Sequence, residues 1–201
     1  MLRMSDVSTE LNTELNNADV IKQVKSWAFD ALSRREHSVA ELRRKLVGKV
    51  QQSPFFSSSF RSSPQFMPND ESNIAEVVDS VLIHCQQLGY ICDERFAEMY
   101  VRDRQQRGYG PLRIRLDLYH KGIDEELVSA FVDIEGDHWF ELAEDLYQRR
   151  FVRGYAIDHN ENSEYLQADT KKLDQKTRAK RLRFFQTRGF LPKHIYPLLG
   201  G

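Results

Sequence analysis

The side chains that could do chemistry in this chain are few, and their spacing matches no catalytic pattern. Asp124, Glu125 and Glu126 carry the carboxylates that general acid–base catalysis uses. The same three residues stand where a new helix is expected to begin, and carboxylates there are stabilised by the positive end of the helix dipole. We therefore interpret them as helix-starting residues and not as a catalytic centre.

Metal-binding and redox motifs are equally absent from the sequence. Six residues separate Cys85 from Cys92, a spacing found in neither zinc knuckles nor redox-active cysteine pairs, and the six histidines are scattered without ligand spacing. The phosphate-binding, dinucleotide-binding, serine-hydrolase and zinc-protease signatures do not occur either. The chain is therefore predicted not to be an enzyme, with no catalytic residue, no metal and no cofactor. Both cysteines are expected to be reduced structural thiols.

Charge is the more informative property of this chain. Its 201 residues carry a formal net charge of -1, but basic residues outnumber acidic ones six to two in 34–49, seven to three in 95–121 and nine to one in 171–193. Residues 123–145 hold nine carboxylates and no Lys or Arg. Such blocks favour a basic face that binds a polyanion or an acidic protein. The alternative is that the basic and acidic blocks pair with one another in the fold.

The chain is expected to be cytoplasmic, with no membrane partner. No apolar run approaches the roughly 18–20 residues that are needed to cross a bilayer. The segment 1–19 is polar and mildly acidic, unlike a signal peptide. We predict that this segment is a flexible N-terminal extension.

Helical patterns account for nearly all of the remaining sequence. Apolar residues from Ile21 to Leu32 recur at helical spacing, Ser38 with Glu41 forms a capping box, and glycine follows several of the segments. No alternating strand pattern competes with them. The expected helices span 21–32, 39–46, 73–88, 93–107, 111–121, 174–188 and 192–199, with two more that start near residues 124 and 137.

The helices recur as three imperfect copies of a three-helix unit. Ile114 and Leu118 align with Leu42 and Leu46, and each copy has a basic second helix. We therefore predict an all-α fold of three tandem three-helix repeats that form an elongated, curved body. The expected boundaries are 20–91 for repeat 1 with a mobile loop at 51–72, 92–135 for repeat 2, and 136–201 for repeat 3 with a loop at 154–173.

The basic second helices are the candidate binding elements. In the second copy, helical geometry places Leu112, Leu116 and Tyr119 on one side and Ile114 with Leu118 on another. We expect both sides to be buried between neighbouring helices, so that the cations face outward. Three such helices would form a basic stripe if the repeats stack in the same orientation. An ordinary solvated helix face is the alternative.

Four segments of the sequence are long enough to indicate a family. They read RREHSVAELRRKL at 34–46, LGYICDERFA at 88–97, RGYGPLRI at 107–114 and RFFQTRGF at 183–190. All four resemble motifs of the RecX family, bacterial regulators of the RecA recombinase, and they occur in the family's order. Two insertions depart from the family pattern: a segment rich in serine and phenylalanine after residue 50, and an extension after residue 155.

The resemblance implies a non-enzymatic modulator that lies in the groove of the RecA–DNA filament. It would block filament extension and so lower the ATP hydrolysis, strand exchange and co-protease activity of RecA. The implied partners are the RecA nucleoprotein filament and, more weakly, single- and double-stranded DNA, and the protein is expected to be a monomer. The candidate contact residues are basic, with one tyrosine added for stacking or packing: Arg34, Arg35, Arg43, Arg44, Lys45, Arg102, Arg104, Arg107, Tyr109, Arg113, Arg115, Lys121, Lys180, Arg181, Arg183 and Arg188. A core or capping role for the tyrosine is the alternative.

Salt dependence tests this contact. The logarithm of affinity falls by roughly 0.7–0.9 per logarithm of salt concentration for each neutralised phosphate, so alanine at Arg113 and Arg115 is expected to flatten the slope. Three alternatives remain open: a helical DNA- or RNA-binding protein without a RecA partner, an enzyme with a new type of site, and a helical adaptor whose basic faces serve only solvation.

Overall fold

The described part of the chain is helical, as predicted. The computed structural model describes residues 4–53, 71–153 and 174–200, and none of these residues forms a strand. Most of the expected loop 51–72 and all of the expected loop 154–173 lie outside the described residues. No helix in the described ranges combines the length and the apolar composition that a membrane crossing requires.

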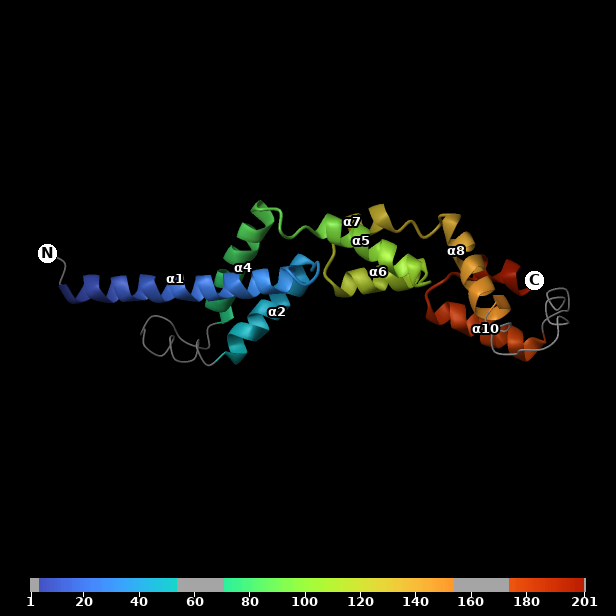
Figure 1. Cartoon of the computed structure of the whole chain (residues 1–201), viewed down its shortest axis with the longest axis horizontal. Helices are drawn as coiled ribbons and strands as arrows, with labels where there is room; N and C mark the ends of the chain where they lie inside the picture. The colour runs from blue at the N-terminus through green and yellow to red at the C-terminus, as the bar shows by residue number, and fades with distance from the viewer. Residues whose placement is uncertain (1–3, 54–70, 154–173, 201) are drawn as a thin grey trace. The chain divides into compact units, whose positions relative to one another are not determined.

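The chain divides into two compact units, and the first, Met1–Phe96, is built around three helices: α1 (Met4–Leu32), α2 (Val39–Gln52) and α4 (Glu71–Gln87). The three helices pack on one another, and α4 crosses α1 (Figure 1). Val24, Leu42 and Val81 contribute one side chain from each helix to the shared core, and none of them has exposed surface. Cys85 lies in the same core, where burial raises the pKa of its thiol.

Helix α1 begins much earlier than predicted. The sequence predicts a flexible segment at 1–19, whereas the structure has the helix already formed at Met4. Between Met4 and Leu32 there is neither glycine nor proline, so no residue in this stretch ends a helix. Helices α2 and α4 likewise extend a short way into the expected loop 51–72.

The second unit, Ala97–Gly201, contains most of the two remaining repeats. The boundary predicted between these two repeats, 92–135 and 136–201, stays a prediction. Phe185 and Phe190 form the centre of a core that also includes Ala143 and Ile195. The elements are α5 (Asp93–Gln106), which starts in the first unit, then α6 (Pro111–His120), α7 (Glu125–Phe131), α8 (His138–Tyr147), the π-helix η1 (Gln148–Arg153), α10 (Gln175–Thr187), α11 (Pro192–Ile195) and the 3-10 helix η3 (Tyr196–Leu199).

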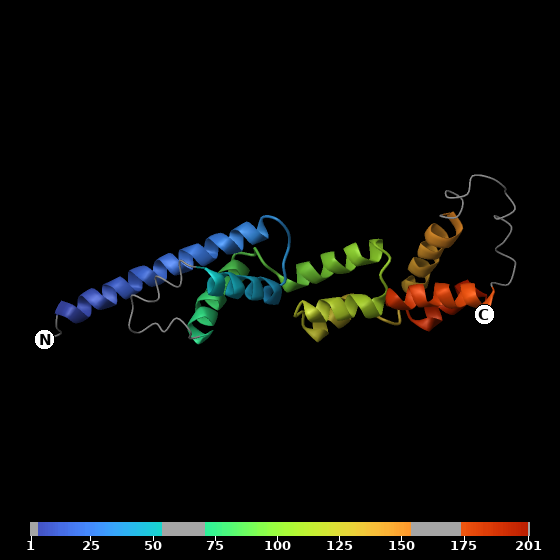
Figure 2. The ribbon, with the colours of Figure 1, turned by 90° about the horizontal axis from the view of Figure 1, so that it is seen from below.

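Repeats 2 and 3 are joined by backbone hydrogen bonds between α6 and α10. The amide of Gly110 donates to the carbonyl of Arg188 at 2.8 Å, and the amide of Leu112 donates to the carbonyl of Gly189 at 3.1 Å. A helix start leaves amides without partners and a helix end leaves carbonyls without partners. Here the amides at the start of α6 bind the carbonyls at the end of α10. Figure 2 shows the start of α6, in yellow-green, beside the end of the red-orange α10.

Glycine is required at this junction. A Cβ atom on Gly110 would lie 2.5 Å from the carbonyl oxygen of Gly189. Gly189 itself has a φ of +85°, and its Cβ would lie 2.3 Å from the nitrogen of Arg113. No side chain fits at either distance, so the two backbones approach this closely only because both residues are glycine.

Only one of the two apolar sides of α6 is buried. Ile114 and Leu118 have no exposed surface, whereas Leu112, Leu116 and Tyr119 are 44%, 46% and 71% exposed. The prediction that both sides face neighbouring helices is therefore wrong. The helix packs on α7 and its first turn meets α10. Among the described residues, these contacts leave the side with Leu112, Leu116 and Tyr119 largely exposed.

His194 in α11 makes the stability of the second unit depend on pH. Its side chain is 3% exposed, and neither ring nitrogen has a hydrogen-bond partner among the described residues. Burial lowers the pKa of His194 below its ordinary value of 6.5. The positive charges of Lys193 and His138 lower it further, and the negative charge of Glu135 raises it in part. The unfolded chain then takes up this proton at a higher pH than the folded protein. Stability is therefore expected to be full above about pH 6.5 and to fall on acidification, by at most about 1.4 kcal/mol per pH unit.

Urea unfolding between about pH 7.5 and about pH 5.5 measures this dependence. The substitution His194→Leu removes the titrating group and is expected to flatten the pH profile. Some slope should remain because burial also lowers the pKa of His37. Identical slopes in the His194→Leu variant and the unaltered protein would contradict the prediction.

Candidate nucleic-acid interface

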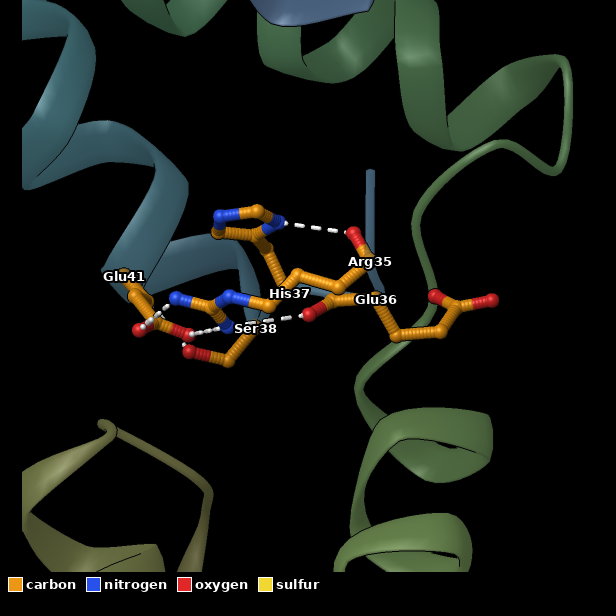
Figure 3. Close-up of polar contacts among 5 residues, drawn as sticks. All are labelled: Arg35, Glu36, His37, Ser38 and Glu41. Atoms are coloured by element: carbon orange, nitrogen blue, oxygen red, sulfur yellow. Dashed lines mark hydrogen bonds and ion pairs between the residues drawn. The ribbon is translucent and has the colours of Figure 1, made fainter. Parts of the chain in front are cut away.

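The first turn of α2 is held by a polar cluster that includes Arg35, one of the predicted contact residues (Figure 3). The Oγ of Ser38 accepts a hydrogen bond from the Glu41 amide at 3.1 Å, as the capping box predicts. The Glu41 carboxylate binds Arg35, with 2.9 Å between Oε1 and Nη2, and this hydrogen bond raises the pKa of Arg35. Arg35 also donates to the carbonyl of Glu36 at 3.1 Å. The side chain of Arg35 therefore serves to order this turn.

A buried histidine and an aspartate fix the same turn from the other side. His37 is 1% exposed, and its Nδ1 lies 2.9 Å from the carbonyl oxygen of Arg35, which accepts the hydrogen bond. The amide of Val39 donates to the carboxylate of Asp93 at 2.8 Å, which links the start of α2 to the start of α5. Burial lowers the pKa of His37 and raises the pKa of Asp93. These contacts set the direction in which α2 leaves the turn.

Several basic residues of repeat 1 are paired with carboxylates. Arg43 makes two hydrogen bonds to Asp79 of α4, at 2.7 and 3.0 Å, and they hold the pKa of Asp79 below its usual value. Arg34 pairs at 2.9 Å with an aspartate one turn earlier. Arg44 and Lys45 are exposed on α2, and Lys45 has no ion pair with a described residue. Of the predicted contact residues in this repeat, Arg34, Arg35 and Arg43 therefore already have carboxylate partners.

Arg104 of repeat 2 lies between two tyrosine rings. Its guanidinium carbon is 4.7 Å from the ring centroid of Tyr100 and 5.4 Å from that of Tyr109. The Lys121 ammonium lies 5.4 Å from the Tyr100 ring, and Asp117 lies 3.8 Å from Nε of Arg104. A cation over an aromatic face is attracted by the ring's quadrupole. Arg104, Tyr109 and Lys121 therefore take part in packing α5 against α6.

The two predicted arginines of α6 already have carboxylate partners. Nε of Arg113 lies 3.0 Å from Asp117, and Arg115 pairs with Glu125 of α7. The second pair joins a basic residue to the carboxylate-rich segment 123–145. The alternative in which the charge blocks pair with one another is therefore confirmed in part, through Arg115, one of the two residues chosen from the sequence for a salt test.

Two further predicted arginines, Arg102 in α5 and Arg107 just after it, differ from each other. Arg107 pairs with Asp103, one turn earlier, at 2.9 Å. Arg102 is exposed and has no ion pair with a described residue. An exposed pair one turn apart contributes little to stability, about 0.3–0.5 kcal/mol, so Arg107 is only weakly held.

Two of the predicted arginines of repeat 3 are held inside the unit. Arg188 donates to the carbonyls of Arg107 at 2.9 Å and Gly108 at 3.1 Å, across the junction between repeats 2 and 3. Arg181 donates to the hydroxyl of Tyr147, and its guanidinium lies 5.0 Å from the ring centroid of Phe151. Both arginines therefore stabilise the second unit.

Three cations on the outer side of α10 have no carboxylate partner among the described residues. Lys176, Lys180 and Arg183 are exposed, and none of them forms an ion pair within the described ranges. Their spacing of four and three residues places them on one side of the helix, about 6 and 4.5 Å apart along its axis. Helix α10 contains no Asp or Glu. We call these three residues the α10 stripe, and a row of free cations of this kind is what nucleic-acid phosphates bind.

Lys176 is absent from the candidates that the sequence suggests. It lies in the first turn of α10, after the N-cap Asp174. Its spacing of four residues from Lys180 is the signal that places both on the same side of the helix.

Known proteins identify the family of this chain. A family model described as RecX, second three-helix domain, matches residues 93–130. Regulatory protein RecX of Serratia proteamaculans is 36% identical over 176 residues, which cover 85% of this chain and 92% of the relative. The chain belongs to the RecX family. Regulatory protein RecX of Yersinia enterocolitica is also 36% identical, over 68% of this chain and 81% of the relative.

Two solved RecX structures share the fold. The crystal structure of RecX from Lactobacillus salivarius is similar with a TM-score of 0.58 at 21% identity, covering 90% of this chain and 95% of that one. A crystal structure of regulatory protein RecX has a TM-score of 0.60 at 20% identity and covers 99% of this chain and 79% of that one. The family membership that the four sequence motifs indicate is therefore confirmed, as is the all-helical fold.

Proposed function

We propose that this protein is a non-enzymatic negative modulator of RecA. It binds the RecA–DNA filament and limits filament extension, and with it ATP hydrolysis, strand exchange and co-protease activity. The observation that carries the proposal is the similarity to regulatory protein RecX over 85% of the chain. In this proposal the protein acts as a cytoplasmic monomer.

The α10 stripe supplies the contact with DNA in this proposal. Its three cations have no ion pair with a described residue, whereas an arginine that is already paired must first give up its carboxylate. The exposed cations Arg44, Lys45 and Arg102 extend the list of candidates. The paired residues among the predicted contacts, such as Arg43 and Arg115, are expected to contribute less.

ATP hydrolysis by RecA on single-stranded DNA tests the proposal. Adding this protein at well below one molecule per RecA subunit is expected to lower the rate, because a modulator that stops filament extension acts on more subunits than it touches. The protein alone, assayed with ATP and DNA but without RecA, provides the control for an activity of its own. Inhibition that appears only when the protein is abundant enough to cover the DNA would contradict the proposal.

A helical nucleic-acid-binding protein without a RecA partner is the second candidate function. The α10 stripe favours it, since free cations bind phosphates with or without a protein partner. Equal affinities for naked single-stranded DNA and for the RecA filament would support this candidate over the first.

A further inference from the structure

The exposed apolar side of α6 has no counterpart in the other two basic helices. Leu112, Leu116 and Tyr119 form it, at spacings of four and three residues, and each is at least 44% exposed. We call these three residues the α6 stripe. Side chains four and three residues apart on a helix adjoin one another, so the three form one continuous patch.

The repeats can be compared position by position at this site. Helix α2 aligns with α6 by matching the buried Leu42 to the buried Ile114. Helix α10 aligns with α6 by matching Gly189, which follows α10, to Gly122, which follows α6. At the positions of the two α6-stripe leucines, the other helices carry a small residue followed by an exposed arginine: Ala40 and Arg44 in α2, and Ala179 and Arg183 in α10.

The charges that flank the α6 stripe are already paired. Arg115 on the α7 side is bound to Glu125, and Arg113 on the other side is bound to Asp117. A nucleic-acid strand over the stripe would bring its phosphates close to these carboxylates. Exposed Glu126 adds a further negative charge in the first turn of α7. Both the apolar surface and the charges around it therefore disfavour nucleic acid here.

We propose that the α6 stripe docks the apolar side of an amphipathic helix of a protein partner, with lysine or arginine at its edge. Apolar side chains at i, i+4 and i+7 are the pattern by which one helix packs on another. The exposed carboxylate of Glu126 complements a basic edge on the partner. Large side chains such as Tyr119 are the type that carries most of the binding energy in protein interfaces.

The inference rests on the proposed function in one respect: the partner is the protein component of the RecA–DNA filament. It adds a division of labour between two helices of the second unit. The α10 stripe binds phosphates, and the α6 stripe binds protein. Specificity for the filament over naked DNA then comes from α6.

The double substitution Leu112→Ser with Leu116→Ser tests the proposal in the full chain. Affinity is measured for naked single-stranded DNA and for RecA filaments assembled on the same DNA with a non-hydrolysable ATP analogue. Filament affinity is expected to fall by about tenfold or more, while affinity for naked DNA stays within about twofold. The leucines are 44% and 46% exposed, so only a small fall in the thermal unfolding temperature is expected, and this is measured alongside.

Two further variants sharpen the comparison. Ile83→Ser removes an apolar side chain that is 53% exposed on α4, and it is expected to leave both affinities unchanged. Glu126→Lys reverses an exposed charge in the first turn of α7, one residue after Glu125, and is expected to weaken filament binding without weakening DNA binding. Stronger filament binding by Glu126→Lys would contradict the basic edge proposed for the partner.

The outcomes separate the inference from the function on which it rests. Unchanged filament affinity in the double variant, or an equal loss on filament and naked DNA, would overturn the docking role of the α6 stripe and leave RecA modulation standing. If the unaltered protein bound filaments no more tightly than naked DNA, the proposed function itself would fail.

Discussion

Replacing Gly189 with alanine is expected to lower the free energy of unfolding of the second unit by about 3–5 kcal/mol. Gly189 has a φ of +85°, and its Cβ would lie 2.3 Å from the nitrogen and 2.6 Å from the Cβ of Arg113. The clash can be relieved only by moving α6 away from α10, which breaks the hydrogen bonds donated by Gly110 and Leu112. The substitution therefore acts on the junction between repeats 2 and 3.

Two other glycines separate the effect of the positive φ on stability from the effect of the backbone clash. Gly89 has a φ of +70°, but no atom lies within 4 Å of the point that its Cβ would occupy, so Gly89→Ala should cost only the conformational part, about 1 kcal/mol. Gly48 lies inside α2 with open space around it, so Gly48→Ala should stabilise the protein by about 0.5–1 kcal/mol. Of the three substitutions, Gly189→Ala alone combines an unfavourable φ with a backbone clash.

Urea unfolding and hydrogen exchange measure these effects. The amides of Gly110 and Leu112 should lose protection from exchange in Gly189→Ala and keep it in Gly89→Ala. A cost for Gly189→Ala no larger than that for Gly89→Ala would show that the close approach of α6 and α10 does not hold in solution.

Alanine at Lys176, Lys180 and Arg183 together is expected to reduce the log–log salt slope of single-stranded DNA binding by about 2 and to lower affinity about tenfold or more at low salt. Each residue is exposed and has no ion pair with a described residue, so each is free to neutralise a phosphate. Loss of a phosphate contact weakens binding to all sequences alike. Fluorescence anisotropy across a range of salt concentrations measures both quantities.

Alanine at Arg113 and Arg115 provides the matched control on α6. Both arginines are bound to carboxylates, Asp117 and Glu125. The sequence predicts a flatter slope for this variant, whereas the ion pairs lead us to expect a change below about 1. A larger change in the α6 variant than in the α10 variant would place the phosphate contacts on α6 instead.

The sequence alone predicted most of the helices and the glycines that end them. Gly89, Gly108, Gly122 and Gly189 were each expected to follow a helix, and each has a positive φ, between 70° and 85°. Ser38 caps α2 as its spacing from Glu41 indicates. Caps and helix ends depend on residues within about four positions of one another, so the information is local. The family could also be recognised at this level because its motifs are continuous in the sequence.

Only the tertiary structure decided which cations are free and which apolar side of α6 is covered. Arg43 and Asp79 are 36 residues apart, and Lys193 pairs with Glu135 from 58 residues away. The periodicity of α6 shows two apolar sides but not which of them meets another helix. Ion pairing and burial depend on distances between segments that are remote in sequence, and a pattern within one helix contains no information about those distances.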